Sequence, residues 1–219
     1  MTYTRNTLTK FYWIALLAFL IALLFAFSDP IGRLCIAIFA LVLTFLAIRS
    51  ITSQVIVSGK KISTKNLFSE NSINITPESR IYIRRNIQSL FLVLRHYDYS
   101  IKIVNPNKSL TLNANVNSAD ELYDAIAQLE QKIILPILIE RFSKQNSLVM
   151  DQDLSINNQG IRYKNKDYPY ESLSKIEFKD GYFRLLAEGK LWQTAVLALP
   201  ISSIPNSITF STLLYSQSS

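Results

Sequence analysis

Two long apolar runs near the start of the chain restrict its fold more than any other feature. Residues 11–27 (FYWIALLAFLIALLFAF) and 34–48 (LCIAIFALVLTFLAI) contain no charged side chain. A helix needs about 20 residues to cross a hydrocarbon core of about 30 Å, and the flanking residues 7–9 and 30–33 can supply the missing turns. We therefore predict a transmembrane helical hairpin that forms a two-helix anchor over residues 1–50.

Two other interpretations of these runs fit less well. A cleaved signal peptide would require a small-x-small cleavage site after Phe27, but none is present and a second apolar run follows. A buried helical pair in a soluble protein would require polar faces, and neither run has one. Membrane insertion is the interpretation that fits both runs.

The distribution of basic residues predicts the orientation of the hairpin. Arg5 and Lys10 precede the first run and Arg49 follows the second, whereas the connection between them carries only Arg33, next to Asp29. Positive residues are retained on the cytoplasmic side of a membrane. Both termini and everything after residue 50 are therefore expected in the cytoplasm. The net charge of +7 is concentrated in residues 49–108, close to the membrane.

From residue 51 the sequence becomes typical of antiparallel sheet, with short β-branched runs between polar turns. Over residues 51–116 we expect five to seven strands, among them a hairpin that turns at Gly59 and a fully buried strand over residues 90–94. A capping box at Ser118 then predicts the start of an amphipathic helix, and Pro136 should kink or divide it. This first unit extends over residues 51–145.

Residues 146–219 show the same order of strands, turns and a final helix. Turns are expected at Asn157–Gly160 and at Asp180-Gly181, and a short helix over residues 207–215. The parallel between the halves indicates an internal duplication. Two unrelated sheets that share turn chemistry would give a similar pattern.

Four short motifs of the second half resemble, in order and spacing, those of an uncharacterised bacterial family of membrane-anchored proteins with tandem pleckstrin-homology-like (PH-like) units. They are Asn158-Gln159-Gly160-Ile161, Tyr170-Glu171-Ser172-Leu173, Lys179-Asp180-Gly181 and Ile204-Pro205-Asn206.

The resemblance implies an α+β fold in which the transmembrane hairpin precedes two PH-like antiparallel β units, each closed by a C-terminal helix. It also implies a multi-pass protein of the bacterial cytoplasmic (inner) membrane, and it implies no reaction. Tyr170 stands where the family tends to carry tryptophan. The second unit is short, so that one unit is incomplete or the two share a sheet.

No residue set in the sequence specifies a reaction. His96 is the only histidine and Cys35 the only cysteine, and the acidic pair Asp151 and Asp153 lacks the other ligands of a calcium loop. We therefore predict a protein that is not an enzyme and that holds no metal or cofactor. A small membrane-bound enzyme that uses His96 is the alternative from that class.

Basic residues close to the membrane form the first candidate site, for anionic lipid headgroups. They are Lys60, Lys61, Lys65, Arg80, Arg84 and Arg85. The same patch could attract nucleic acid, but the sequence shows no base-stacking motif and the anchor limits access, so we expect no nucleic-acid partner.

Aromatic residues of the second half form the other candidate site, for a protein partner, although such residues also build sheet cores. They are Tyr163, Tyr168, Tyr170, Tyr182, Phe183 and Trp192. The leading functional hypothesis is a membrane-anchored, non-enzymatic binding or scaffolding module that recognises a protein partner. The alternative is a sensor or binder of anionic lipid headgroups. The sequence leaves two further partners open: a second copy of the chain, and a toxin that the protein blocks in the membrane.

Overall fold

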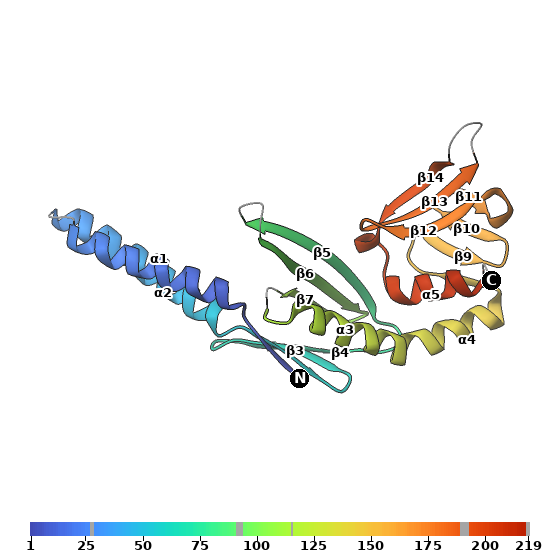
Figure 1. Cartoon of the computed structure of the whole chain (residues 1–219). Coiled ribbons are helices and arrows are strands. Elements are labelled where there is room, and N and C mark those ends of the chain that lie inside the picture. Colours follow the sequence, from blue (N-terminus) through green and yellow to red (C-terminus); the bar gives the residue numbers. More distant parts are fainter. Residues whose placement is uncertain (27–28, 91–93, 115, 189–192, 218–219) are drawn as a thin grey trace.

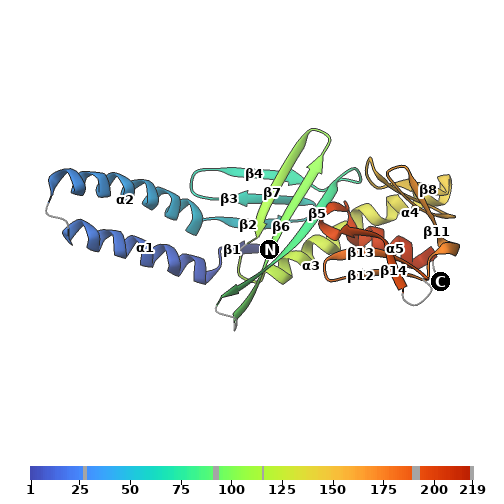
Figure 2. The ribbon, with the colours of Figure 1, turned by 90° about the horizontal axis from the view of Figure 1, so that it is seen from above.

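The computed structural model describes residues 1–26, 29–90, 94–114, 116–188 and 193–217. Its elements are a pair of apolar helices, several antiparallel sheets, a long interrupted helix and a C-terminal helix. The predicted α+β class is therefore confirmed. Figure 1 and Figure 2 show the helical pair projecting from one end of the molecule, with the second half of the chain at the opposite end.

The helical pair consists of α1 (Thr7–Ala26) and α2 (Pro30–Ile51). Both helices are long and apolar enough to cross a membrane, with a mean hydropathy of 2.0 over Thr9–Ala26 and 2.5 over Pro30–Ile51. Only 6% of each segment is buried, and the side chains of Phe25 and Leu41 are 83% and 72% exposed. The pair thus presents an almost continuous apolar surface.

This helical pair is inserted into a four-stranded sheet. β1 (Thr2–Thr4) precedes α1 and pairs with β2 (Gln54–Ser58), which follows α2; β3 (Lys61–Lys65) and β4 (Glu70–Asn74) complete the sheet in sequence order. The β2–β3 hairpin turns at Gly59 with a φ of 54°, as its glycine predicts. β1 has no counterpart among the predicted strands.

A three-stranded sheet follows. It contains β5 (Arg80–Leu90), β6 (Leu94–Asn105) and β7 (Lys108–Ala114) in that order. The prediction of one buried strand over residues 90–94 is wrong, because Leu90 ends β5 and pairs with Leu94, which begins β6. Residues 91–93 lie outside the described part of the chain.

The long helix is divided by a π-helical turn. It comprises α3 (Ala119–Leu129), the π turn η1 (Glu130–Ile134) and α4 (Leu135–Gln145). The predicted division near Pro136 is confirmed, since the π-helical turn interrupts the α-helix directly before α4 and the proline lies in the first turn of α4. The predicted capping box is wrong: Ser118 has a φ of 59° and its side chain makes no capping hydrogen bond.

The second half repeats the order of a four-stranded sheet, a three-stranded sheet and a helix. The first sheet contains β8 (Ser147–Val149), β9 (Leu154–Asn157), β10 (Gly160–Tyr163) and β11 (Lys166–Pro169). After the 3₁₀ turn η2 (Tyr170–Ser172), the second contains β12 (Lys175–Lys179), β13 (Tyr182–Glu188) and β14 (Gln193–Pro200). The 3₁₀ turn η3 (Ile201–Ser203) leads to α5 (Ser207–Gln217).

Aromatic packing fixes α5 against the last sheet. The rings of Phe183 and Phe210 meet edge to face with their centroids 5.1 Å apart, and both side chains are fully buried. The turn at Asp180-Gly181 has a positive φ at both residues, as the sequence predicts for a two-residue hairpin. α5 thus closes the second half as an apolar helix that packing stabilises.

Asn206 joins the two halves of the chain. Its N–H donates to the Ile81 carbonyl (2.8 Å), its Oδ1 accepts from the Ile81 N–H (2.9 Å), and its Nδ2 donates to the Ser79 carbonyl (3.0 Å). The residue before α5 therefore pairs with the backbone at the start of β5 as a neighbouring strand would. Arg80 and Asp151 add an ion pair of 3.0 Å between the same two halves.

A buried carboxylate takes over the capping of α5. Glu130, in the π turn, is 0% exposed, and its Oε1 accepts a hydrogen bond of 2.7 Å from the Thr209 N–H. Burial raises the pKa of Glu130 to about 7, and the Thr209 N–H offsets part of that rise. Because the side chain of Asn206 bonds to β5, an acceptor from another helix satisfies the start of α5.

Candidate functional site

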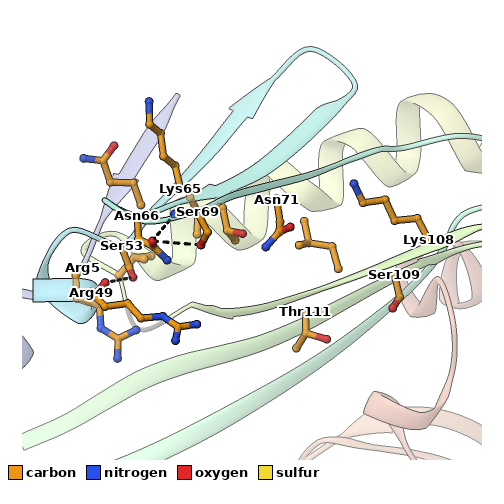
Figure 3. Close-up of a pocket in the computed structure, with 15 residues that line it drawn as sticks. Arg5, Arg49, Ser53, Lys65, Asn66, Ser69, Asn71, Lys108, Ser109 and Thr111 are labelled. Atoms are coloured by element: carbon orange, nitrogen blue, oxygen red, sulfur yellow. Dashed lines mark hydrogen bonds between the residues drawn. The ribbon is translucent and has the colours of Figure 1, made fainter. Parts of the chain in front are cut away.

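A basic cavity lies at the base of the helical pair, where α1 and α2 join the first sheet (Figure 3). Its volume is about 520 Å³. Its walls come from the link between β1 and α1, from the end of α2, from β2 to β4 with the β3–β4 turn, and from β7 and the residue Val116 after it. The lining residues are Arg5, Arg49, Ser53, Gln54, Val55, Thr64, Lys65, Asn66, Ser69, Asn71, Lys108, Ser109, Leu110, Thr111 and Val116.

Short connections place the basic residues there. Arg5 lies between β1 and α1 and pairs with Val116 after β7, while Arg49 lies in the last turn of α2. In the register of the β2–β3 hairpin, Lys65 is opposite Gln54, the first residue after the α2 connection. The residues that flank the apolar helices and the end of β3 are therefore brought to one end of the cavity, and Figure 3 shows Lys108 at the other.

The wall of the cavity at the β3–β4 turn is held by a single amide side chain. Asn66 Oδ1 accepts hydrogen bonds of 2.9 Å from both the Phe68 and Ser69 N–H groups, and the Asn66 N–H donates to the Ser69 carbonyl (2.9 Å). Ser53 Oγ donates to the Arg49 carbonyl (2.8 Å) at the end of α2. The polar rim is thus built from fixed turns.

The lining is cationic and contains no carboxylate. Arg5, Arg49, Lys65 and Lys108 line the cavity together with hydroxyl and amide side chains, and no aspartate or glutamate does. Within the described residues, Arg49, Lys65 and Lys108 make no ion pair. This arrangement suits an anion, and guanidinium groups in particular suit phosphate oxygens.

The residues that the sequence singled out for chemistry do not form a metal site in the described part of the chain. No group of three or more histidine, cysteine, aspartate or glutamate side chains is close enough to hold a metal ion in that part of the chain. Cys35 is exposed on α2, and Asp151 pairs with Arg80. His96 lies on β6 opposite Gln88, but its side chain falls outside the description.

Sequence comparison adds a family to this geometry. Residues 2–219 match a family of unknown function, DUF6585. The chain belongs to the DUF6585 family. No curated protein and no solved structure matches it. The expectation of a family without an assigned activity is thus confirmed, while the PH-like relationship stays a prediction.

In the structure of this DUF6585 chain, the six basic residues predicted as one headgroup site lie in different places. Lys65 lines the basic cavity, and Lys61 lines a neighbouring hollow with Lys108. Lys60 occupies the exposed β2–β3 turn. The three arginines lie elsewhere: Arg80 pairs with Asp151, and Arg84 and Arg85 line a cleft of about 710 Å³ between the halves.

Three lining cations of the DUF6585 chain are missing from the predicted set. Arg5 and Arg49 flank the apolar runs in the sequence, and that position indicates only the orientation of the helices in a membrane. Lys108 follows the turn at Pro106 and carries no signal of its own. The folded sheet is needed to bring these residues together.

The aromatic residues predicted as one partner-binding site also lie in different environments. Tyr168 and Phe183 are buried, and Tyr163 and Tyr170 are partly buried against the core. Tyr182 is 43% exposed and lines the cleft between the halves. Trp192 lies outside the described residues. These residues therefore do not share one surface in the described part of the DUF6585 chain.

Proposed function

We propose that this chain is a membrane-anchored binding module whose basic cavity holds the phosphate headgroup of an anionic lipid. The observation that carries the proposal is a cavity with four cations and no carboxylate at the point where two apolar helices join the body. Each basic residue near an anionic membrane surface contributes about 1 kcal/mol to binding. The alternative hypothesis from the sequence thereby becomes the leading one.

The exposed apolar surface of α1 and α2 supports insertion in a bilayer. Soluble proteins rarely expose contiguous apolar patches larger than a few hundred Å², and the helical pair is apolar over both full lengths. Near the body, Trp13 Nε1 donates to Ser50 Oγ (3.1 Å) between the helices, and tryptophan is enriched at membrane interfaces. A membrane covers the pair and leaves the cavity beside the headgroups.

The charges at the two ends of the helical pair support the proposed orientation. Arg5, Lys10 and Arg49 lie at the end next to the sheets, and Arg33 lies near the far turn. By the positive-inside rule both termini and both halves of the chain are cytoplasmic. We place the protein in the bacterial inner membrane as a multi-pass, non-enzymatic component. The order of four strands, three strands and a helix in each half accords with two PH-like units.

The test compares two neighbouring lysines of one hairpin. Lys65 lines the cavity and Lys60, in the β2–β3 turn, does not, although both residues are exposed. Full-length protein in detergent is titrated with phosphatidylglycerol or phosphatidylcholine, and retained lipid is counted by native mass spectrometry. We expect preferential retention of phosphatidylglycerol, reduced about fivefold by Lys65→Ala and unchanged by Lys60→Ala.

Two results would contradict the proposal. Equal retention of the two lipids by the unaltered protein would show that the cavity does not select an anionic headgroup. Equal effects of Lys65→Ala and Lys60→Ala would show that general surface charge, and not the cavity, attracts the lipid.

A protein partner is the second candidate, because the cleft between the halves exposes an aromatic ring beside a basic side chain. Tyr182 is 43% exposed there, and Arg84 lines the same cleft. A photo-crosslinking residue at position 182, in cells, should join one protein reproducibly and lose it in the Arg84→Ala variant. Crosslinks confined to lipid or to the chain itself would exclude this role for the cleft.

A further inference from the structure

The β3–β4 turn carries two exposed apolar side chains that have no part in the basic cavity. The turn consists of residues 66–69 (NLFS), between Lys65 at the end of β3 and Glu70 at the start of β4. Leu67 is 67% exposed and Phe68 is 51% exposed. Single exposed apolar residues are common on folded proteins, so the position of this pair in the molecule decides its meaning.

The turn lies beside the helical pair. Because β2 begins directly after α2 and pairs antiparallel with β3, the end of β3 returns to the end of α2. Figure 2 shows the β3–β4 turn at this end of the sheet. The rings of Phe68 and Phe45, on α2, have their centroids 4.7 Å apart. The two exposed side chains therefore continue the apolar surface of the helices onto the first sheet.

The contact with Phe45 places the turn at a defined depth along α2. Trp13 donates to Ser50 Oγ between the helices, and tryptophan side chains collect at headgroup level. Phe45 precedes Ser50 by five residues, which corresponds to about 7.5 Å along a helix. Apolar groups of interfacial proteins enter the boundary between headgroups and acyl chains by about 5–10 Å. Phe68 reaches this boundary when the helices span a bilayer.

The backbone of the turn is suited to a region that holds little water, where a polar group without a hydrogen bond is costly. Asn66 Oδ1 accepts from the N–H groups of Phe68 and Ser69, and the Asn66 N–H donates to the Ser69 carbonyl. The Leu67 N–H donates to Thr52 Oγ1 (3.2 Å), at the end of α2. Every N–H group of the turn is thus bonded within the protein, and one of these bonds ties the turn to α2.

We propose that the β3–β4 turn is a third membrane contact, in which Leu67 and Phe68 insert at the acyl-chain boundary of the leaflet next to the sheets. Lys65 and Glu70 limit the depth of insertion, since charged side chains stay at headgroup level. Because Asn66 of the same turn lines the basic cavity, this contact holds the cavity against the headgroups. The inference rests on the membrane insertion in the proposed function and adds a surface that docks the first sheet on the bilayer.

A fluorophore at three positions tests this contact. The full-length chain with Cys35→Ala receives a single cysteine for labelling with bimane, by Leu67→Cys in the turn, Leu41→Cys on α2 or Lys60→Cys in the β2–β3 turn. Each protein is placed in a nanodisc of phosphatidylcholine and phosphatidylglycerol and exposed to aqueous iodide, or to lipid that carries a doxyl quencher on its acyl chain.

We expect the label at position 67 to behave like the label at position 41. Both should lose quenching by iodide, emit at shorter wavelength and be quenched by the doxyl lipid. The label at position 60 is the matched control at the other end of the same sheet, and it should keep its quenching by iodide and escape the doxyl lipid. Packing within the protein does not explain a loss of iodide quenching at position 67, because Leu67 is exposed in the folded chain.

The outcomes separate this inference from the proposed function. If position 67 matches position 60 while position 41 is quenched by the doxyl lipid, the inference is overturned and the membrane anchor stands. If the doxyl lipid quenches positions 67 and 60 equally, the contact is not particular to the β3–β4 turn and the inference is overturned as well. If iodide quenches all three positions, the membrane insertion on which the proposed function depends fails too.

Discussion

Replacing Asn206 by alanine should release the second half of the chain from β5. The substitution leaves the Ile81 N–H without its acceptor and the Ser79 carbonyl without its donor, both in a buried environment. A buried polar group without a partner costs about 1–3 kcal/mol. Asn206 also has a φ of 51°, a conformation that costs a residue such as alanine roughly 1 kcal/mol or more. The two groups and the backbone conformation together give an expected loss of about 3–7 kcal/mol.

Hydrogen–deuterium exchange on the full-length protein in detergent measures this loss locally. Because each 1.4 kcal/mol corresponds to a factor of ten, the amide of Ile81 should exchange at least about a hundredfold faster in Asn206→Ala. Asn206→Gly should be the milder variant, since glycine accepts the positive φ while it lacks the same side chain.

Asn158→Ala is the control for this experiment, because Asn158 is an exposed asparagine in a turn of the same half. It should leave the exchange of Ile81 unchanged. If the protection of Ile81 in Asn206→Ala equals that in Asn158→Ala, then the side chain of Asn206 does not hold the halves together and the reasoning is refuted.

Two further substitutions test buried features of the fold. Burial raises the pKa of Glu130 from 4.5 to about 7, so the carboxyl group ionises at lower pH in the unfolded chain than in the folded one. The free energy of unfolding should therefore be highest below pH 4.5 and fall by about 3 kcal/mol as the pH rises to 7. Glu130→Gln should flatten this decline in thermal unfolding of the full chain between pH 5 and 8, and an unchanged slope would contradict the assignment. Gly160→Ala would place a Cβ atom against the Tyr168 carbonyl oxygen, a backbone atom that cannot rotate away. We expect the midpoint of thermal unfolding to fall by several degrees. Gly59→Ala is the control: its Cβ meets no atom within 4 Å, so the variant should lose only the roughly 1 kcal/mol that alanine pays for the positive φ.

The elements of the fold were predictable wherever the pattern was local. The apolar runs gave α1 and α2, and the turns at Gly59 and Asp180 gave hairpins with the expected positive φ. β1 was not predictable, because three residues carry no periodicity and their partner strand lies beyond the helical pair. Ser118 failed as a cap because its left-handed backbone turns the side chain away from the first helical N–H groups.

The candidate site was only partly predictable, because its charges come from four places in the sequence. Lys65 was in the predicted set, but Arg5, Arg49 and Lys108 join it only after β7 is placed beside β4. Grouping by proximity in sequence failed for Arg80, which the fold directs to Asp151 instead. A tertiary partner decides such cases, and one sequence does not contain that information.

The insertion of the helical pair between β1 and β2 also constrains how the chain folds. β1 is synthesised before the helical pair but has no partner until residues 5–53 have been added, so closing the sheet means closing a long loop. In the proposed arrangement the bilayer removes most of that entropy cost, since the inserted hairpin brings its two ends together before β2 appears. Membrane insertion would then be the step that nucleates the first sheet, and variants that slow insertion should delay folding of the cytoplasmic part as well.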